Sequence, residues 1–176
     1  MKVYFMRHGE TDYNVKKLIN CDPGKRIGLN NTGRKQILDI AMKLKNVHFD
    51  AIYASEFLRT QQSAGIINEN RGVLVKIDKR INEAKIGFEG EVDSKYQSAA
   101  SEDPLGFKIE GGENWYDAKK RVSNFLNDLK AKKYSCVLVV THEFVVQVVN
   151  GIVNNLPDKE ARFIRFKNSE FLEFEL

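Results

Sequence analysis

The opening stretch of the chain, residues 2–11, constrains the fold more than any other. Residues 2–7 form a largely apolar run without Gly or Pro, and Arg7-His8-Gly9 closes it. This pattern predicts a buried strand that ends at Gly9. Arg7 and His8 would then lie where a strand meets a loop, a common place for active-site groups in sheets flanked by helices. An imidazole beside a permanent planar cation suits phosphate chemistry. The alternative is a strand end with two solvated polar residues.

The rest of the chain alternates between strand and helix patterns. In chain order, the predicted elements are strand 2–7, a helix capped by Thr32, strand 51–54, a helix capped by Ser55, strand 73–77, a helix from Glu113, strand 135–140, a helix after His142, and strands 161–166 and 170–176 as a hairpin around Asn168-Ser169. Residues 10–31 are predicted to be a long loop with one helical turn, and residues 79–112 an irregular connection with a short helix. The run at 135–140 is the most strand-like and should be central in the sheet.

This alternation predicts an α/β fold, a three-layer sandwich in which a mostly parallel central sheet carries helices on both faces. The chain shows no internal repeat, low-complexity segment or linker, so residues 1–176 are expected to form a single domain. Within it, residues 84–112 are expected to act as a lid that sets specificity. The oligomeric state is left open, with a homodimer as one option.

The composition is that of a globular protein, with 42% hydrophobic and 30% charged residues. No apolar run approaches the roughly 18 residues that a membrane span needs. Met1 leads directly into the first strand, so no signal or transit peptide is expected. Cys21 in a polar loop and Cys136 in a core strand are expected to be free thiols of a reducing cytoplasm.

The charge balance is basic, with a net charge of +4 and a pI of about 9.0. Such a balance fits nucleic acid, an acidic membrane surface or an anionic small substrate. The lysines are scattered, and the Phe residues near the C-terminus lack the basic partners of a base-stacking platform. Solvated helix faces explain these charges better, so neither nucleic acid nor a membrane is expected as a partner.

Three predicted strands are followed by residues that suit one chemistry. The first ends in Arg7-His8, the second is followed by Arg59, and the central strand by His142. In an open parallel sheet the carboxyl ends of the strands face one crevice, so these side chains should converge. Arg forks match phosphate oxygens, and helix N-termini add N–H donors. The sequence therefore predicts a pocket for a dianionic phosphoryl group.

Six ordered sequence elements resemble the histidine phosphatase superfamily, also called the phosphoglycerate mutase-like fold. They are Arg7-His8-Gly9-Glu10-Thr11 with Asn14, Leu29 to Gln36, Ser55 to Ala64, Glu83 with Gly87, Gly111-Gly112-Glu113, and Val139-Val140-Thr141-His142. Asn168-Ser169 also fits the tail of that family. The resemblance spans nearly the whole chain.

The resemblance implies a metal-independent phosphatase that needs no cofactor and hydrolyses a small phosphorylated metabolite, a phosphate monoester, through a phosphohistidine. The implied roles are, in chain order, phosphate binding by Arg7, nucleophilic attack by His8, phosphate binding by Asn14 and Arg59, general acid and base catalysis by Glu83, and phosphate binding by His142. The histidines lack the spacing of zinc ligands, and His48 is expected to be structural or solvated.

The chain departs from the family pattern at three positions. Glu56 replaces a Pro, which should alter only a helix start. Cys21 stands where many members have a Gly in the loop over the pocket. Glu143 replaces the usual Gly after the second His, so its carboxylate either repels phosphate or points outward to a cationic part of the substrate.

Two other functions remain open. A cofactor-dependent phosphoglycerate mutase is the alternative within the family, but mutases of this fold carry an insertion between the acid Glu and the Gly-Gly-Glu element, and residues 83–111 are short. A non-catalytic module that binds a phosphorylated partner is the second alternative, although it would not need the acid Glu83. Glu113 either caps a helix or contacts substrate. Phe88, Tyr96 and Phe107 either line an opening or pack the lid.

Overall fold

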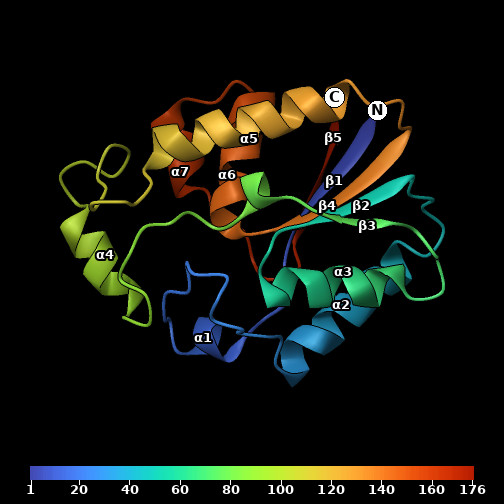
Figure 1. The fold of residues 1–176 in the computed structure, drawn as a ribbon, viewed down its shortest axis with the longest axis horizontal. Helices are drawn as coiled ribbons and strands as arrows, with labels where there is room; N and C mark the ends of the chain where they lie inside the picture. Colours follow the sequence, from blue (N-terminus) through green and yellow to red (C-terminus); the bar gives the residue numbers. More distant parts are fainter.

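The computed structural model describes all residues, 1–176, as a sheet of five strands with helices around it (Figure 1). In chain order its elements are β1 (Lys2–Arg7), α1 (Asp12–Val15), α2 (Asn31–Lys43), β2 (Ala51–Ala54), α3 (Leu58–Asn68), β3 (Val75–Ile77), a short 3-10 helix (Lys79–Ile81), α4 (Asp93–Ala99), α5 (Trp115–Lys130), β4 (Cys136–Thr141), α6 (Glu143–Val153), α7 (Asp158–Phe163) and β5 (Phe171–Glu175).

The strands lie in the order β3-β2-β4-β1-β5. Strands β3, β2, β4 and β1 are mutually parallel, and only the edge strand β5 runs antiparallel to its neighbour β1. The prediction of a mostly parallel sheet with residues 135–140 at its centre is confirmed. In the register of β1 and β4, Arg7 lies opposite Thr141, so the residues that follow these two strands emerge side by side.

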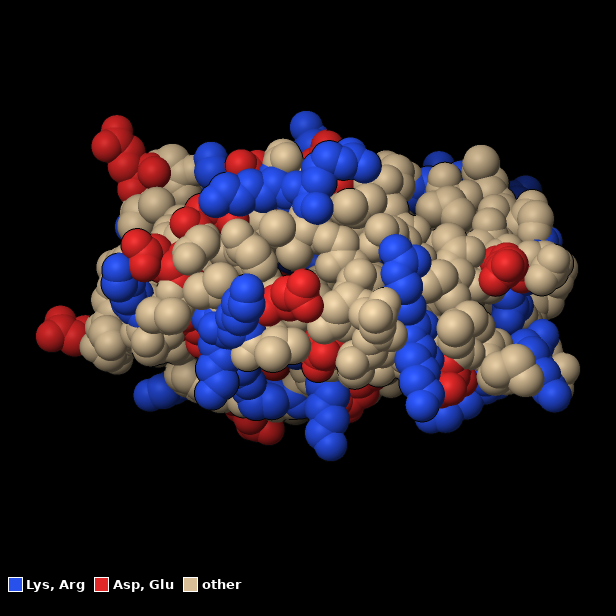
Figure 2. Space-filling model, turned by 90° about the horizontal axis from the view of Figure 1, so that it is seen from below, with Lys and Arg blue, Asp and Glu red and all other residues tan.

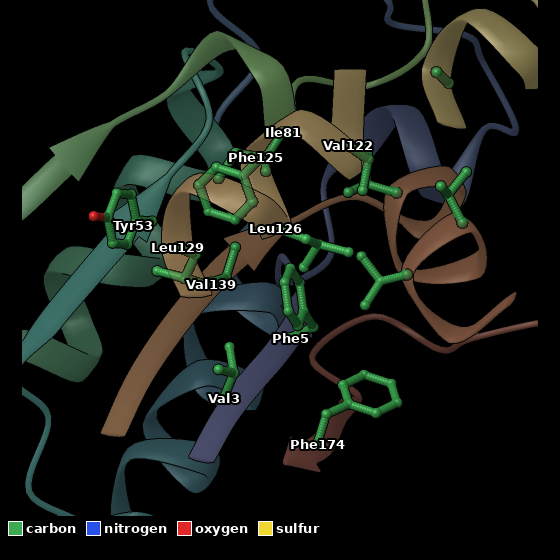
Figure 3. Packing of buried hydrophobic residues seen from close by; sticks show 14 of the residues in the cluster. Val3, Phe5, Tyr53, Ile81, Val122, Phe125, Leu126, Leu129, Val139 and Phe174 are labelled. Carbon is green, nitrogen blue, oxygen red and sulfur yellow. The ribbon is translucent and has the colours of Figure 1, made fainter. Parts of the chain in front are cut away.

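Alternate residues of the inner strands β1, β2 and β4 face two different cores, which makes the fold a three-layer sandwich. Val3 and Phe5 pack with α5 and α6, whereas Tyr4 and Met6 pack with α2 and α3. The first core contains several aromatic side chains, among them Phe5 and Phe125 (Figure 3). The ring centroids of these two residues lie 6.5 Å apart in an edge-on arrangement. The inner strands are apolar on both faces because helices cover both faces.

Several predicted element boundaries are wrong by a few residues, and each has a local cause. The predicted N-cap Thr32 lies inside α2, which Asn30 caps by accepting a hydrogen bond from the Gly33 N–H at 2.7 Å. Strand β3 begins at Val75 rather than 73, because the Asn68 side chain occupies both the N–H and the C=O of residue 73. A side chain that bonds the backbone in this way competes with the sheet ladder.

The start of α5 also differs from the prediction. Asn114 caps this helix and forms a reciprocal pair of bonds with Asp117, so the helix begins at Trp115 rather than at Glu113. Glu113 instead forms a two-pronged ion pair with Arg121, at 2.5 and 2.8 Å. The carboxylate is therefore structural, and neither the predicted cap nor a cavity residue.

The prediction of a strand at 161–166 is wrong. Residues 158–163 form helix α7, and β5 pairs with β1 rather than with a hairpin partner. The apolar content of this segment suggests a strand, but Ala161 is wholly buried against α6, where a Cβ on Gly151 would lie 2.8 Å from the Cβ of Ala161. The glycine lets the two helices approach closely, and this tertiary contact overrides the local pattern.

Figure 2 shows Lys and Arg interspersed with acidic and uncharged residues on the face that it presents. No helix is both long and apolar enough to cross a bilayer. Cys21 and Cys136 are free thiols, as predicted.

Candidate active site

The residues predicted to bind phosphate come together at the carboxyl ends of β1 and β4. The rings of His8 and His142 lie 5.3 Å apart, centroid to centroid. A cavity of about 490 Å³ opens above them, a size typical of sites for small molecules. Of the site residues predicted from the sequence, five line this cavity: Arg7, His8, Asn14, Arg59 and Glu83. His142 does not line it, because Arg59 lies against that ring.

The loop after β1 is fixed by α2 and α3, and this placement determines where His8 points. A Cβ on Gly9 would lie 2.6 Å from the carbonyl oxygen of Gly33, so the loop packs directly on the start of α2. Gln36 accepts the Glu10 N–H at 3.0 Å, and Ser63 accepts the Gly9 N–H at 3.2 Å. Residues 29–36, the second of the sequence elements that resemble the family, therefore support the loop that carries His8.

His8 is 2% exposed and held by both ring nitrogens. Its Nδ1 lies 2.7 Å from the carbonyl oxygen of Gly9, and the Arg59 Nε–H donates to its Nε2 at 3.0 Å. These partners assign the proton to Nδ1 and leave a lone pair on Nε2. Burial, followed by the positive charges of Arg59 and Arg7, holds the pKa of His8 well below its ordinary value. The ring is thus neutral, with a lone pair on Nε2.

Arg59 links the two histidines. Its Nη2 lies 3.2 Å from His142 Nδ1, and it also donates to the carbonyl oxygen of Asn20 at 3.1 Å, while Nη1 donates to the Asn20 side-chain oxygen. The guanidinium stacks 4.3 Å from the ring centre of Phe57. Burial lowers the pKa of Arg59 to about 10, so it remains a cation at neutral pH.

A chain of hydroxyl groups behind the cavity orients His142. Its Nε2 lies 2.8 Å from Ser55 Oγ, which lies 2.7 Å from Thr60 Oγ1. The Thr60 hydroxyl donates to the Phe57 carbonyl oxygen at 2.8 Å, so it accepts from Ser55, and Ser55 in turn accepts from the His142 Nε2–H. Burial and the charge of Arg59 hold the pKa of His142 well below its ordinary value. Ser55 was predicted to cap α3, but that helix begins only at Leu58.

Glu143 resolves one of the questions that the sequence left open. Its carboxylate lies 3.0 Å from Arg7 Nη1 and 3.2 Å from Arg165 Nε, and it accepts the Phe166 N–H at 3.1 Å. It therefore neither faces the phosphate site unpaired nor points to solvent. Arg7 Nη1 also donates to the Phe166 carbonyl oxygen at 2.5 Å, so Glu143 and residue 166 together fix the direction of the Arg7 fork.

Glu83 lies at the side of the cavity with its side chain 24% exposed. It accepts the Ala84 N–H at 3.0 Å, and its other oxygen lies 3.9 Å from His142 Nδ1. Burial raises the pKa of Glu83, against the opposing effect of Arg59 and Arg7. A carboxyl group with a raised pKa, beside a cavity lined by arginines, can donate a proton.

Asn14 presents a neutral donor to the same cavity. Its Oδ1 accepts from the Thr11 N–H at 3.0 Å and from Asn168 Nδ2 at 3.2 Å. Its own amide N–H groups have no partner in the protein, so they are free to bind an oxygen. Asn168 also donates to the His8 carbonyl oxygen at 3.2 Å, which gives the predicted Asn168-Ser169 element a place beside the site.

Residues 84–112 close one side of the cavity by packing against the loop after α1. Tyr96 contacts Phe88 and Phe107, with ring centroids 6.2 and 6.0 Å apart, and it packs with Ile19 and Cys21. The alternative of lid packing is therefore correct for these aromatics, although Tyr96 also lines the cavity. Cys21 Sγ donates to the Gly87 carbonyl oxygen at 3.4 Å, and burial raises the pKa of its thiol to about 11.

Sequence reasoning missed two groups that orient the site. Asn20 lies in a polar loop with no pattern around it, and Ser55 stands where a cap is expected. No signal in the sequence alone distinguishes Asn20 from its neighbours. No group of three or more His, Cys, Asp or Glu side chains is arranged to hold a metal ion. His48 is exposed, away from the site.

Comparison with known proteins identifies the family of the chain. The family model of the histidine phosphatase superfamily (branch 1) matches residues 3–176. A protein of Cronobacter sakazakii named "Probable phosphoglycerate mutase GpmB" is 26% identical over 96% of this chain and 81% of its own length. Fructose-2,6-bisphosphatase TIGAR of Bos taurus is 34% identical over 70% of this chain and 48% of its own. The crystal structure of α-ribazole phosphatase from Shigella flexneri superposes with a TM-score of 0.90 and 24% identity, covering 100% of this chain and 91% of that one.

Proposed function

Because the chain belongs to the histidine phosphatase superfamily, we propose that it is a metal-independent phosphatase that hydrolyses small phosphate monoesters through a phosphohistidine on His8. The observation that carries this proposal is the state of the His8 ring. Its Nδ1 is tied to the Gly9 carbonyl at 2.7 Å, and its Nε2 lone pair accepts the Arg59 Nε–H at 3.0 Å in the wall of the cavity. Positioned positive charge supplies most of the catalysis of phosphoryl transfer, and the arginines provide it.

The first step transfers the phosphoryl group to the protein. Nε2 of His8 attacks phosphorus in line, the N–P bond forms, and the ester P–O bond breaks. The carboxyl group of Glu83 gives its proton to the leaving alkoxide. In the structure, the Arg59 Nε–H donates to Nε2 of His8. When substrate binds, this N–H turns from the ring to a phosphate oxygen and leaves the Nε2 lone pair free to attack. Arg7 holds another oxygen of the transferring group. His142, whose only N–H donates to Ser55, lies behind Arg59 and positions that guanidinium rather than binding phosphate itself.

The second step releases phosphate. Glu83, now a carboxylate, takes a proton from water, whose oxygen attacks phosphorus as the N–P bond breaks. His8 then recovers its lone pair, and Glu83 its proton. Loss of one of the phosphate-holding donors is expected to cost about 3–4 kcal/mol, on the order of a thousandfold in rate.

The experiment is to incubate the protein with a phosphate ester, quench, and measure acid-labile phosphate on the protein. We expect it on the wild type and not on His8→Ala. Turnover of p-nitrophenyl phosphate no faster than the His8→Ala control would instead identify a module that only binds phosphorylated partners. Trapping of phosphate on His8→Ala would show that another residue is the nucleophile.

The role of Glu83 has its own test. For Glu83→Gln we expect a large loss with alkyl phosphates, whose alkoxide must be protonated, and a smaller loss with p-nitrophenyl phosphate, whose leaving group needs no acid. An equal loss for the two esters would contradict an acid role.

The second candidate is a phosphoglycerate mutase, because curated relatives that cover nearly all of this chain carry that name. A mutase returns the phosphoryl group to the substrate, whereas a phosphatase gives it to water. With 3-phosphoglycerate, release of inorganic phosphate without formation of the 2-isomer is expected. Isomer formation in excess of phosphate release would favour the mutase.

A further inference from the structure

The cavity holds a cation that the proposed phosphatase mechanism does not use. Arg162 on α7 lines the same cavity as His8, yet it is only 7% exposed. No carboxylate lies within ion-pair distance of its guanidinium, which distinguishes it from Arg7, where Glu143 lies 3.0 Å away. A nearly buried charge without a counter-ion is costly, so its retention beside a cavity calls for an anion from outside the chain.

The neighbours of Arg162 hold its fork in place without neutralising it. Nη1 donates to the Gln147 side-chain oxygen at 3.3 Å, and Gln147 is itself fixed because its Nε2 donates to the Ile164 carbonyl oxygen at 2.8 Å. The guanidinium lies 4.7 Å from the centre of the Phe144 ring. The Nε atom is buried with no hydrogen-bond partner, and Nη2 also has none within the protein. Nη2 is therefore an oriented donor that the protein itself leaves unused.

A second arginine extends the positive charge of Arg162 to the rim of the cavity. Arg165, three residues further along, also lines the cavity, and its side chain is 70% exposed. Its Nε reaches Glu143 at 3.2 Å, so it is partly compensated, whereas Arg162 is not. Arg162 lies on α7 and His8 follows β1, so a ligand that touches both must span the cavity.

We infer that Arg162, oriented by Gln147, binds a second anionic group of the substrate, so that the preferred substrate is a phosphate monoester carrying a carboxylate or a further phosphate away from the reacting one. The part of this inference that concerns the substrate rests on the proposed function. The anion site itself concerns binding alone and does not depend on catalysis. Planar guanidinium forks bind both carboxylate and phosphate, and each charge-assisted bond contributes substantially when desolvated.

The test uses non-hydrolysable ligands, so that binding is measured apart from catalysis. Phosphonates of increasing chain length that end in a carboxylate are titrated calorimetrically against matched phosphonates that end in a neutral carboxamide. At the length that spans the cavity, the wild type is expected to bind the carboxylate ligand about tenfold to a hundredfold more tightly. A bisphosphonate arm shows whether phosphate serves better than carboxylate as the second anion.

The variants identify the residue. Arg162→Gln is expected to bring the two affinities to within about twofold, and Arg162→Lys, which keeps the charge but loses the fork, to give an intermediate ratio. Lys159→Gln is the matched control: it removes one positive charge from an exposed position of α7 and should keep the full preference. Unfolding midpoints similar to that of the wild type establish that the variants are folded. If a variant does not fold, the ratio of carboxylate to carboxamide affinity in the wild type still tests the site.

The outcomes separate the two proposals. No preference in the wild type at any chain length would overturn the anion site. Equal weakening of both ligands in Arg162→Gln would overturn it as well, because Arg162 would then serve the reacting phosphate. A preserved binding preference in a protein that hydrolyses no ester would sink the phosphatase proposal and leave the anion site standing.

Discussion

At the scale of single residues, the reactive groups could be predicted and the groups that orient them could not. His8, Arg59 and His142 follow strands in recognisable motifs, so their convergence follows from parallel topology. Ser55 was assigned to a helix start because serine favours that position, but the helix begins later and its hydroxyl faces a ring 87 residues away. Contacts of this kind are formed by tertiary structure and leave no local pattern.

Ser55 gives the first prediction at this scale. Ser55→Ala would leave the His142 Nε2–H buried without an acceptor, which costs about 1–3 kcal/mol. We expect a lower unfolding free energy and a fall in kcat/KM of on the order of tenfold, because the ring loses its fixed orientation. Ser98→Ala, at an exposed position, is the control. Unchanged kinetics in a destabilised Ser55→Ala protein would restrict the hydroxyl to a purely structural role.

Glu143 gives the second prediction at the scale of single residues. Replacing its carboxylate in Glu143→Gln frees Arg7 from a counter-ion 3.0 Å away, so inorganic phosphate should inhibit the enzyme at about tenfold lower concentration, which corresponds to about 1.4 kcal/mol. Product inhibition measured with p-nitrophenyl phosphate checks this. Weaker inhibition would mean that orienting Arg7 matters more than leaving it uncompensated.

In the proposed mechanism, His8 and Glu83 set the pH dependence of catalysis. Because the pKa of His8 is lowered, the nucleophile stays neutral below pH 6.5, and the acid limb of kcat/KM should lie below that value. Because the pKa of Glu83 is raised, alkyl phosphates should lose rate as pH rises through that pKa. The basic limb should weaken with p-nitrophenyl phosphate. A basic limb of equal size for both esters would assign it to another group.

At the scale of elements, residues 84–112 are tied to the site through one carboxylate. Glu89 accepts the Cys21 N–H at 2.6 Å, the Asp22 N–H at 3.0 Å and the Asn20 Nδ2–H at 3.1 Å. Asn20 in turn holds Arg59. The segment therefore helps to fix Arg59, the proposed phosphate-binding cation, and does more than cover the cavity.

Glu89→Ala should loosen this connection. We expect faster hydrogen exchange in residues 19–24 and a fall in kcat/KM of on the order of tenfold, because Arg59 is held less firmly. Glu91→Ala is a close control, since its carboxylate pairs only with Lys95 on the exposed surface. Equal effects of the two substitutions would show that the Glu89 bonds are not specific to the site.

Helix α7 shows why one element escaped prediction. Residues 161–166 are rich in apolar side chains, as many strands are, whereas the close fit of Ala161 against Gly151 favours a helix there. Gly151→Val should cost about 1–3 kcal/mol in urea unfolding, because a side chain would overlap α7. Gly65→Ala in α3 is the opposite case: a Cβ there meets nothing within 4 Å, so it should stabilise by about 0.5–1 kcal/mol.

At the scale of the whole molecule, the buried histidines link stability to pH. His8 and His142 have lowered pKa values when folded, so below about pH 6.5 the unfolded chain binds protons that the folded chain does not. Each ring then reduces the unfolding free energy by about 1.4 kcal/mol per pH unit, down to its folded pKa. Above pH 6.5 the loss disappears.

Urea midpoints measured between about pH 7.5 and 5.5 check this. His142→Asn should flatten the slope by the share of one ring, and the exposed His48→Asn should leave it unchanged. A slope equal to that of the wild type in His142→Asn would show that this ring is protonated in the folded state.

The order of strands in the sheet has a consequence for how the protein is made. Strand β1 leaves the ribosome first, but its two neighbours, β4 and β5, come from residues 136–141 and 171–175. An apolar strand must therefore wait unpaired through most of translation, during which domains otherwise begin to fold as they emerge. Nascent chains of this protein should be clients of ribosome-associated chaperones until their final strand is synthesised.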